Sequence, residues 1–212
     1  MKDFVLNYNQ KKIVRKIDFL SKNFYLAGGT ALAIQIGHRT SVDFDFYSEK
    51  EFDYKKLYSK FRKTFGRETS KLIAAEDTLE FRIKSINLSF FKYPYSLIRP
   101  MIKWQSLYLA SLEDIAAMKI EAIIGRGTKR DFVDIYYLIK KFGIKKVLGF
   151  AEEKYKELFN RYIVLRSLIY FIDAEKKGQG RIRINLFDAK TDWESIKKYL
   201  IQEVKKYQKS II

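Results

Sequence analysis

The chain has 212 residues, of which 47% are hydrophobic and 32% are charged, a balance typical of a folded globular protein. It has no cysteine and a single histidine, which excludes disulfides, thiol nucleophiles, iron–sulfur clusters and metal sites built from several histidines. The net charge of +17 favours a polyanionic partner, nucleic acid first; a lysine-biased composition unrelated to any partner is the alternative. No segment resembles a signal peptide or reaches the roughly 18 apolar residues of a membrane helix, so we expect a soluble cytoplasmic protein without membrane contacts.

The first half of the chain predicts a mixed sheet with flanking helices. This interpretation rests on apolar residues at helical spacing, short apolar runs, alternation of apolar and polar residues, and helix-capping motifs. In chain order we predict a helix over 4–22, a strand over 24–27, a helix over 30–36, a strand over 42–47, a helix from 48 to about 66 opened by a capping box at 48–51, and two or three strands within 70–92.

The second half predicts mostly helices. After a short strand at 107–110, we predict helices over 112–124, 129–142, 145–158, 160–175 and 192–209, with a loop or short strand at 178–187. A sheet followed by helices is an α+β pattern. We therefore expect an α+β protein with two parts, a mixed-sheet core over 1–110 and a helical C-terminal domain over 111–212. The stretch from 140 to 212 carries 18 basic and nine acidic residues, so it is the more basic part.

A Gly-Gly turn joins the strand at 24–27 to the helix that follows. Gly28 and Gly29 allow a close backbone approach to a ligand, and the free N–H groups of the next helix suit a phosphate. A plain strand–helix turn is the alternative.

Two aspartates alternate with apolar residues a dozen positions later. Asp43 and Asp45 share one face of the predicted strand, whereas Phe44 and Phe46 face the core. Neighbouring carboxylates repel, and an oxygen-seeking cation such as Mg²⁺ between them removes that cost. The alternative is an edge strand with a solvated acidic face. The closeness in sequence to a phosphate-type turn favours the metal.

A lysine interrupts the apolar stripe of the helix at 112–124. Lys119 lies four residues after Ile115 and four before Ile123. A buried ammonium group must be paired, by a nucleotide phosphate or by an acid. The alternative is a lysine whose tip reaches solvent.

A basic–acidic motif opens the helix at 129–142. Asp131 and Asp134 share a face of this helix, and Arg130 lies one turn from Asp134. A surface ion pair of little energetic weight is the alternative to a functional role.

The stretches FYLAGGTALAIQIGHRTSVDFDFYS (24–48) and LASLEDIAAMKIEAIIGRGTKRDFVDIYYLIKKFG (109–143) resemble the AbiEii/AbiGii family of nucleotidyltransferase-like toxins. They cover about 60 of 212 residues with matching order and spacing. The resemblance implies a nucleotidyltransferase core of the DNA polymerase β type, and the toxin half of a bacterial toxin–antitoxin or phage-defence pair.

The resemblance also implies roles for individual residues. Triphosphate would be held by Gly28, Gly29 and Thr30, with Ser41 beside the metal site, and Mg²⁺ (or Mn²⁺) by Asp43 and Asp45. Lys119 and Arg130 would contact nucleotide phosphate, Asp131 would be the late catalytic acid, and Arg39 and Asp134 would support the site. One departure stands out: a third carboxylate often found on a later strand is absent from 86–91, which offers Asn87 and Ser89 instead.

The function expected from these features is Mg²⁺-dependent transfer of a nucleoside monophosphate from an NTP to an acceptor. RNA, with tRNA among the candidates, is the expected acceptor, and a cognate antitoxin is an expected partner. Two alternatives stay open: a nucleotide-binding regulatory protein that has lost transfer, and a kinase-like γ-phosphoryl transferase. The missing third carboxylate favours both alternatives slightly.

Overall fold

The computed structural model describes residues 1–20, 23–75, 77–176, 184–188 and 191–211. The chain forms two compact units, each described here by itself. The first unit comprises residues 1–37 and 41–111, and the second comprises residues 38–40 and 112–212. The short segment 38–40 thus belongs to the second unit, although the chain on either side of it belongs to the first.

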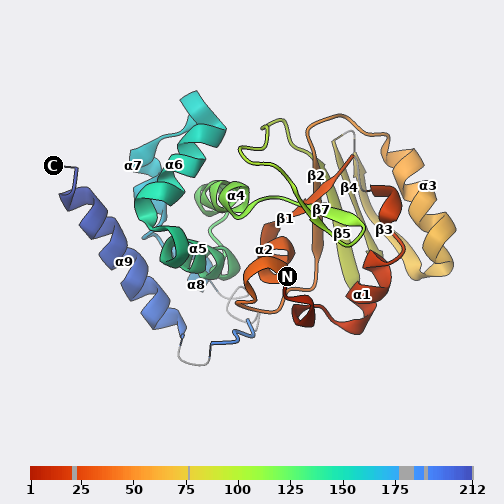
Figure 1. Ribbon diagram of the computed structural model, residues 1–212, viewed down its shortest axis with the longest axis horizontal. Coiled ribbons are helices and arrows are strands. Elements are labelled where there is room, and N and C mark those ends of the chain that lie inside the picture. Colours follow the sequence, from red (N-terminus) through yellow and green to blue (C-terminus); the bar gives the residue numbers. More distant parts are fainter. Residues whose placement is uncertain (21–22, 76, 177–183, 189–190, 212) are drawn as a thin grey trace. The chain divides into compact units, whose positions relative to one another are not determined.

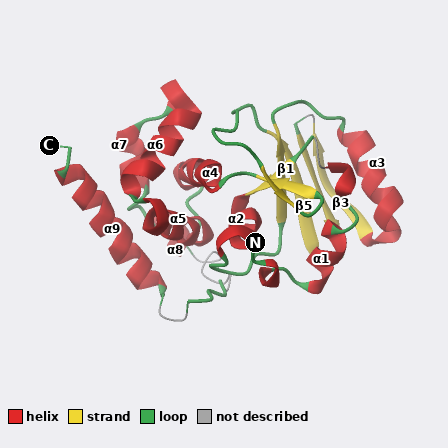
Figure 2. Cartoon of the chain, viewed as in Figure 1, coloured by secondary structure: helices red, strands yellow, loops and turns green. Residues whose placement is uncertain are grey.

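The first unit contains a mixed sheet and three α-helices among its described residues (Figures 1 and 2). Its elements are η1 (Asp3–Val5), α1 (Tyr8–Val14), η2 (Asp18–Leu20), β1 (Tyr25–Ala27), α2 (Gly28–Ile36), β2 (Phe44–Ser48), α3 (Tyr54–Phe65), η3 (Gly66–Glu68), β3 (Thr69–Ala75), β4 (Thr78–Ile83), β5 (Ile86–Lys92), β6 (Ile102–Trp104) and β7 (Leu107–Leu109).

Seven strands of the described chain form one sheet in the order β3-β4-β5-β2-β1-β7-β6. The β2–β5 and β1–β7 pairs are parallel, and the other neighbours are antiparallel. Buried and less buried residues alternate along β2, β4 and β5, so the large apolar side chains of these strands lie on one face, where they are buried. Helix α3 covers this face beside β3 and β4 (Figure 1), and the Phe61 ring lies 4.6 Å from the Phe81 ring.

The opposite face of the same strands carries the polar residues. Along β2 the half-buried residues alternate with buried Phe44 and Phe46, and Asp45 is one of them. In the parallel β2–β5 pair, Asp45 lies beside Ser89. Alternation therefore places the carboxylates on the face that the apolar core leaves open.

The second unit is helical apart from one isolated β-bridge between Arg39 and Leu186 in its described part. Helices α4, α5 and α6 pack against one another, and α9 packs against α5 and α6 (Figure 1). The elements are α4 (Leu112–Gly125), α5 (Lys129–Phe142), α6 (Ile144–Tyr155), η4 (Lys156–Leu158), α7 (Arg161–Ser167), α8 (Ile172–Glu175) and α9 (Trp193–Lys209).

The α+β class expected from the sequence is confirmed: a mixed sheet precedes a set of helices. The helix expected over 4–22 is wrong in extent, because only α1 is α-helical there, between two short 3₁₀ turns. Helix α1 starts at a capping box in which Asn7 and Gln10 bond each other's backbone N–H groups. This capping box sets the start of the helix at Tyr8, which apolar spacing alone does not indicate.

The capping box expected at 48–51 is also wrong. Ser48 is the last residue of β2, and α3 begins six residues later, at Tyr54, with Asp53 as its N-cap. The Asp53 carboxylate accepts hydrogen bonds from the backbone N–H groups of Lys55 and Lys56. The helix starts where a side chain bonds two of the free N–H groups of its first turn, as Asp53 does. The sequence spacing at 48–51 matches a capping box but provides no such bonds.

Two further differences concern the second half of the sheet and the helices. Strand β6 was not expected, and it pairs with β7 as a short hairpin. The helix expected over 160–175 is divided into α7 and α8. The loop expected at 178–187 lies largely outside the described residues. Among the described helices, none is both long enough and apolar enough to cross a bilayer.

Candidate active site

The Gly-Gly turn brings the start of α2 against Asp45. Gly28 has φ +65°, a conformation that residues with a side chain rarely adopt. A Cβ atom on Gly28 would lie 2.7 Å from Oδ2 of Asp45. Ala27, the N-cap of α2, provides no side-chain hydrogen bond to the first turn. The turn therefore needs glycine for two reasons, backbone conformation and close approach of a carboxylate.

Asp43 and Asp45 occupy the open face of the sheet at the start of β2. The alternation predicted from the sequence places both on one face, and both are half-buried. The amide Nδ2 of Asn87, on β5, donates a hydrogen bond of 2.9 Å to Oδ1 of Asp43. Two nearby carboxylates provide the hard oxygen ligands that Mg²⁺ prefers, and the cradle at Gly28 leaves room for one of them. The donor set thus fits the divalent cation that the sequence predicts.

Thr30 and Ser41 tie α2 to the segment that precedes β2. The buried Thr30 hydroxyl shares a hydrogen bond of 2.8 Å with the Ser41 hydroxyl and donates to the backbone carbonyl oxygen of Asp43. Gln10, a buried residue of α1, donates its amide to the Ser41 carbonyl oxygen at 2.9 Å. These bonds fix the backbone from which both carboxylates project.

Within the first unit, the structure brings together the predicted residues Gly28, Thr30, Ser41, Asp43 and Asp45. Gln10 and Asn87 were not among the predicted site residues. Gln10 gave no signal beyond being a polar residue in an apolar helical pattern. Asn87 was noticed only as a position without the acid often found on that strand.

A second polar cluster lies inside the second unit, around Lys119. Its Nζ lies 2.8 Å from Oδ1 of Asp131 and 2.7 Å from Oδ2 of Asp134, and the residue is only 5% exposed. Both aspartates come from α5, where the predicted spacing puts them on one face. The pairing of Lys119 is thus with acids, and the alternative of a tip that reaches solvent is wrong.

Asp134 is the centre of this cluster. Its carboxylate accepts hydrogen bonds from Nε and Nη2 of Arg39, at 2.7 and 2.9 Å, and lies 2.7 Å from Nε2 of His38. Asp134 and His38 are buried, so the alternative of a surface ion pair is wrong for Asp134. These contacts explain why segment 38–40 belongs to the helical unit. No sequence pattern indicates a role for His38.

Asp131 combines a capping function with ion pairing. It accepts bonds from the Thr128 hydroxyl, at 2.6 Å, and from the Thr128 backbone N–H, which closes the capping box of α5. Arg126 donates from Nε and Nη2, at 3.0 and 3.1 Å. Arg130, the other cation of the motif, is half-buried.

Electrostatics keep this cluster ionised at neutral pH. Burial opposes the charge of Asp134, but Arg39 and Lys119 outweigh it and hold the pKa of Asp134 well below its usual range. Burial also opposes ionisation of Asp131, yet Lys119 and Arg126 lower its pKa. For Lys119, burial lowers the pKa and the two aspartates more than compensate, so the pKa is raised. Each charge is stable only because its partners are present.

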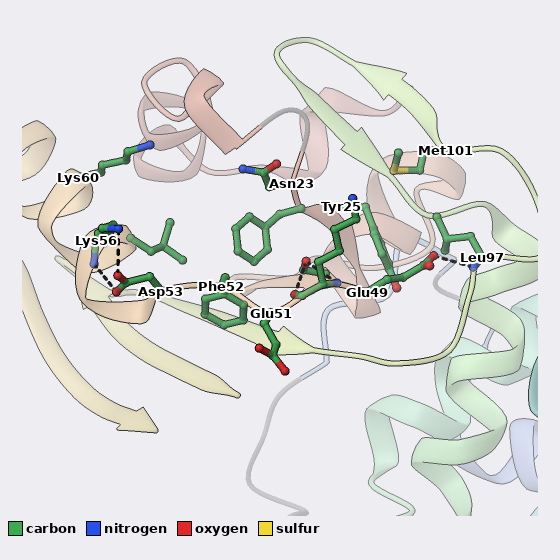
Figure 3. A pocket seen from close by; sticks show the side chains of 14 residues that line it. Asn23, Tyr25, Glu49, Glu51, Phe52, Asp53, Lys56, Lys60, Leu97 and Met101 are labelled. Carbon is green, nitrogen blue, oxygen red and sulfur yellow. Dashed lines mark hydrogen bonds and ion pairs between the residues drawn. The ribbon is translucent and has the colours of Figure 1, made fainter. Parts of the chain in front are cut away.

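A pocket of about 500 Å³ lies elsewhere in the first unit (Figure 3). Tyr25, the first residue of β1, and Ser48, the last residue of β2, line it together with Lys56 and Lys60 of α3. Because β1 and β2 are antiparallel, this is the end of the strand pair opposite to Asp45, which pairs with Ala27. None of the predicted site residues lines this pocket.

Comparison with known proteins assigns the chain to a family. A sequence model of the family described as "Nucleotidyl transferase AbiEii toxin, Type IV TA system" matches residues 13–209. An uncharacterized protein of Aquifex aeolicus (strain VF5) is 35% identical over 210 residues, which are 95% of this chain and 97% of that protein.

Two solved structures show the same fold at low identity. JHP933 from Helicobacter pylori has a TM-score of 0.58 and 17% identity, over 95% of this chain and 91% of that chain. MenT4, a nucleotidyltransferase toxin from Mycobacterium tuberculosis H37Rv, has a TM-score of 0.52 and 14% identity, over 87% of this chain and 75% of that chain. The chain therefore belongs to the AbiEii family of nucleotidyltransferase toxins, and it is a nucleotidyltransferase.

Proposed function

We propose that the first unit binds an NTP with Mg²⁺ at Asp43 and Asp45, and that the protein transfers the nucleoside monophosphate to an RNA acceptor. The observation that carries the proposal is the contact between Gly28 and the Asp45 carboxylate. This contact places the start of α2 beside the carboxylate pair. The N-cap of α2, Ala27, has no side chain that bonds the first-turn N–H groups. Helix N-termini attract phosphate and carboxylates attract Mg²⁺, so both halves of a metal–triphosphate find partners here. Mn²⁺ is the alternative cation.

The proposed reaction is a displacement at the α-phosphorus. An acceptor hydroxyl oxygen forms a bond to the α-phosphorus, the bond from that phosphorus to the oxygen bridging to the β-phosphate breaks, and pyrophosphate leaves. The hydroxyl proton passes to water or to a base. A bound divalent cation supplies charge neutralisation on the phosphate oxygens. Gly28, Gly29 and Thr30 hold the triphosphate through the first turn of α2, and Ser41 and Thr30 keep Asp43 in place.

The Lys119 cluster belongs to the proposal through the family resemblance. The resemblance implies that Lys119 and Arg130 contact nucleotide phosphate and that Asp131 acts as the late acid. It also implies that Arg39 and Asp134 support the site. The ion pairs of Lys119 with both aspartates support a preorganised cluster whose charges are held by pairing, against the cost of burial.

The acceptor is proposed from charge. The stretch from 140 to 212 carries 18 basic and nine acidic residues. Helix α9 contributes exposed lysines at 198, 205, 206 and 209. Such a surface attracts a phosphate backbone without reading its sequence. RNA, with tRNA among the candidates, fits this surface. The family match supports a proposed toxin role with a cognate antitoxin, and we propose that the protein acts in the cytoplasm.

The proposal is tested by the position of the label that is transferred. The protein is incubated with Mg²⁺, total RNA and each NTP labelled at either the α- or the γ-phosphate. Transfer of the α-label supports the proposal. Transfer of the γ-label alone would identify a kinase-like activity, and NTP binding without any transfer would identify a regulatory protein.

A further inference from the structure

Asn87 stands where a third carboxylate would complete a two-metal site. It lies on β5, the strand paired in parallel with β2, two residues before Ser89, the register partner of Asp45. Its Nδ2 lies 2.9 Å from Oδ1 of Asp43. The side chain on β5 that touches the carboxylate pair is therefore a neutral amide.

The orientation of this amide is fixed by a neighbour on β4. Arg82 is the register partner of Asn87, and its Nε donates a hydrogen bond of 3.0 Å to Oδ1 of Asn87. A guanidinium group can only donate, so the amide oxygen must face Arg82. The NH₂ group must then face Asp43. The usual ambiguity between the two ends of an asparagine amide is thereby removed.

This orientation changes what the carboxylate pair can bind. The Asn87 NH₂ group places a hydrogen-bond donor on the Asp43 oxygen, where a carboxylate would offer a lone pair to a cation. A second cation placed there would meet the positive end of the amide dipole, with the Arg82 charge behind it. Among the described residues, no cluster of three or more acidic, histidine or cysteine side chains that could hold a metal is present.

We propose that the Asp43–Asp45 pair is a one-cation site and that Asn87 is the positioning residue that makes it so. Asn87 acts through Asp43: its NH₂ group donates to one oxygen of that carboxylate, so the pair binds a single divalent ion. Two-metal sites place cations about 3.5–4 Å apart, bridged by shared carboxylates. In this chain an amide NH₂ group, rather than a third carboxylate, faces Asp43 from β5. The inference rests on the proposed function, since it concerns the same metal site.

The experiment counts bound ions without any turnover. The full-length protein is titrated with Mn²⁺ alone, and free Mn²⁺ is followed by electron paramagnetic resonance. We expect one ion bound by the wild type and two by Asn87→Asp, which replaces the amide donor with a third carboxylate. Thermal melting of the same samples should show a larger Mn²⁺-dependent rise for Asn87→Asp than for the wild type.

A matched control adds the same charge farther along the same face. Thr78 pairs with Phe91, four residues along β5 from Asn87, or roughly 13 Å at the usual rise per residue. Thr78→Asp should keep one bound ion. Two ions on the wild type, or one ion on a folded Asn87→Asp, would overturn the one-cation inference and leave the proposed function standing. No bound ion on the wild type would overturn the proposed metal site itself.

Discussion

Gly28 and Asp45 are in contact across the β1–β2 pair, and only the absence of a Cβ atom on Gly28 permits it. The Cβ position lies 2.7 Å from Oδ2 of Asp45. This contact links the backbone of the predicted phosphate turn to the predicted metal ligand. The two motifs are 17 positions apart in the sequence, yet they form one site.

Replacing Gly28 by alanine should damage this site specifically. Gly28→Ala should cost about 1–2 kcal/mol of stability from its left-handed backbone and should also push the Asp45 carboxylate aside. Mn²⁺ affinity should therefore fall. Gly66→Ala is the matched control, because Gly66 has φ +59° but nothing within 4 Å of its Cβ position. Calorimetry should show a loss of stability for both variants, and Mn²⁺ titration should show weaker Mn²⁺ binding for Gly28→Ala alone. Equal Mn²⁺ affinities would contradict the account.

Lys119→Met should destabilise the protein strongly. The change leaves two buried carboxylates without their shared ammonium partner, and breaking a buried ion pair costs about 3–5 kcal/mol. Lys154→Met is the control, because Lys154 forms a buried ion pair of 2.9 Å with Asp114 outside the predicted site. Denaturant unfolding should show a large loss for each variant.

Transfer separates the two lysine variants. Assayed at a temperature where both are folded, Lys119→Met should lose roughly 10²-fold or more in rate, the scale of one lost charge-stabilising group. Lys154→Met should stay near the wild-type rate. Comparable rates in the two variants would reduce Lys119 to a structural role.

Stability should fall on mild acidification because of His38. Burial lowers the pKa of His38 below its ordinary value, against the opposing effect of Asp134, so the folded state favours the neutral ring. Below the unfolded pKa of about 6.5 the unfolded chain takes up a proton that the folded chain resists, and stability is lost as the pH falls. The lowered pKa values of Asp131 and Asp134 matter only at more acidic pH.

The measurement is the melting temperature between pH 7.5 and 5.5 for the wild type and for His38→Gln. Glutamine keeps a donor for Asp134 but does not titrate. We expect the fall seen in the wild type to be smaller in the variant. Identical pH profiles would show that His38 does not contribute.

RNA affinity should depend on salt through the lysines of α9. Each phosphate contact to single-stranded RNA contributes a log–log slope of about −0.7. The double variant Lys205→Gln, Lys209→Gln should weaken binding and make the slope shallower, because both side chains are exposed on α9. The matching change at Lys55 and Lys63, exposed on α3, should leave the slope unchanged. If the RNA affinity of the wild type does not depend on salt, the basic residues reflect a lysine-biased composition and not an RNA-binding surface.

Local patterns were sufficient where a few neighbouring residues decide the structure. Alternation identified the common face of Asp43 and Asp45, and the Gly28-Gly29 turn marked the junction of β1 and α2. The end of α5 was likewise readable, since Gly143 has φ +80° directly after Phe142. Each of these features depends on backbone preferences within one or two turns of chain.

Long-range partners could not be predicted, because periodicity within one segment says nothing about which distant segment packs against it. Arg39 and Asp134 are 95 residues apart and meet through a buried bidentate pair. The contact between Asn87 and Asp43 depends on the register of β2 against β5. A one-residue slip of either strand would turn its side chain to the other face, and only packing of the whole sheet selects the register.

The most direct test of the central claim compares the wild type with Asp45→Asn in α-label transfer from NTP to RNA at saturating Mg²⁺. Removing one of two neighbouring charges should relieve repulsion, so the melting temperature of the metal-free variant should hold or rise while transfer is abolished. Asp43→Asn should behave in the same way. A folded Asp45→Asn protein that transfers the α-label at the wild-type rate would contradict the assignment of the carboxylate pair as the metal site.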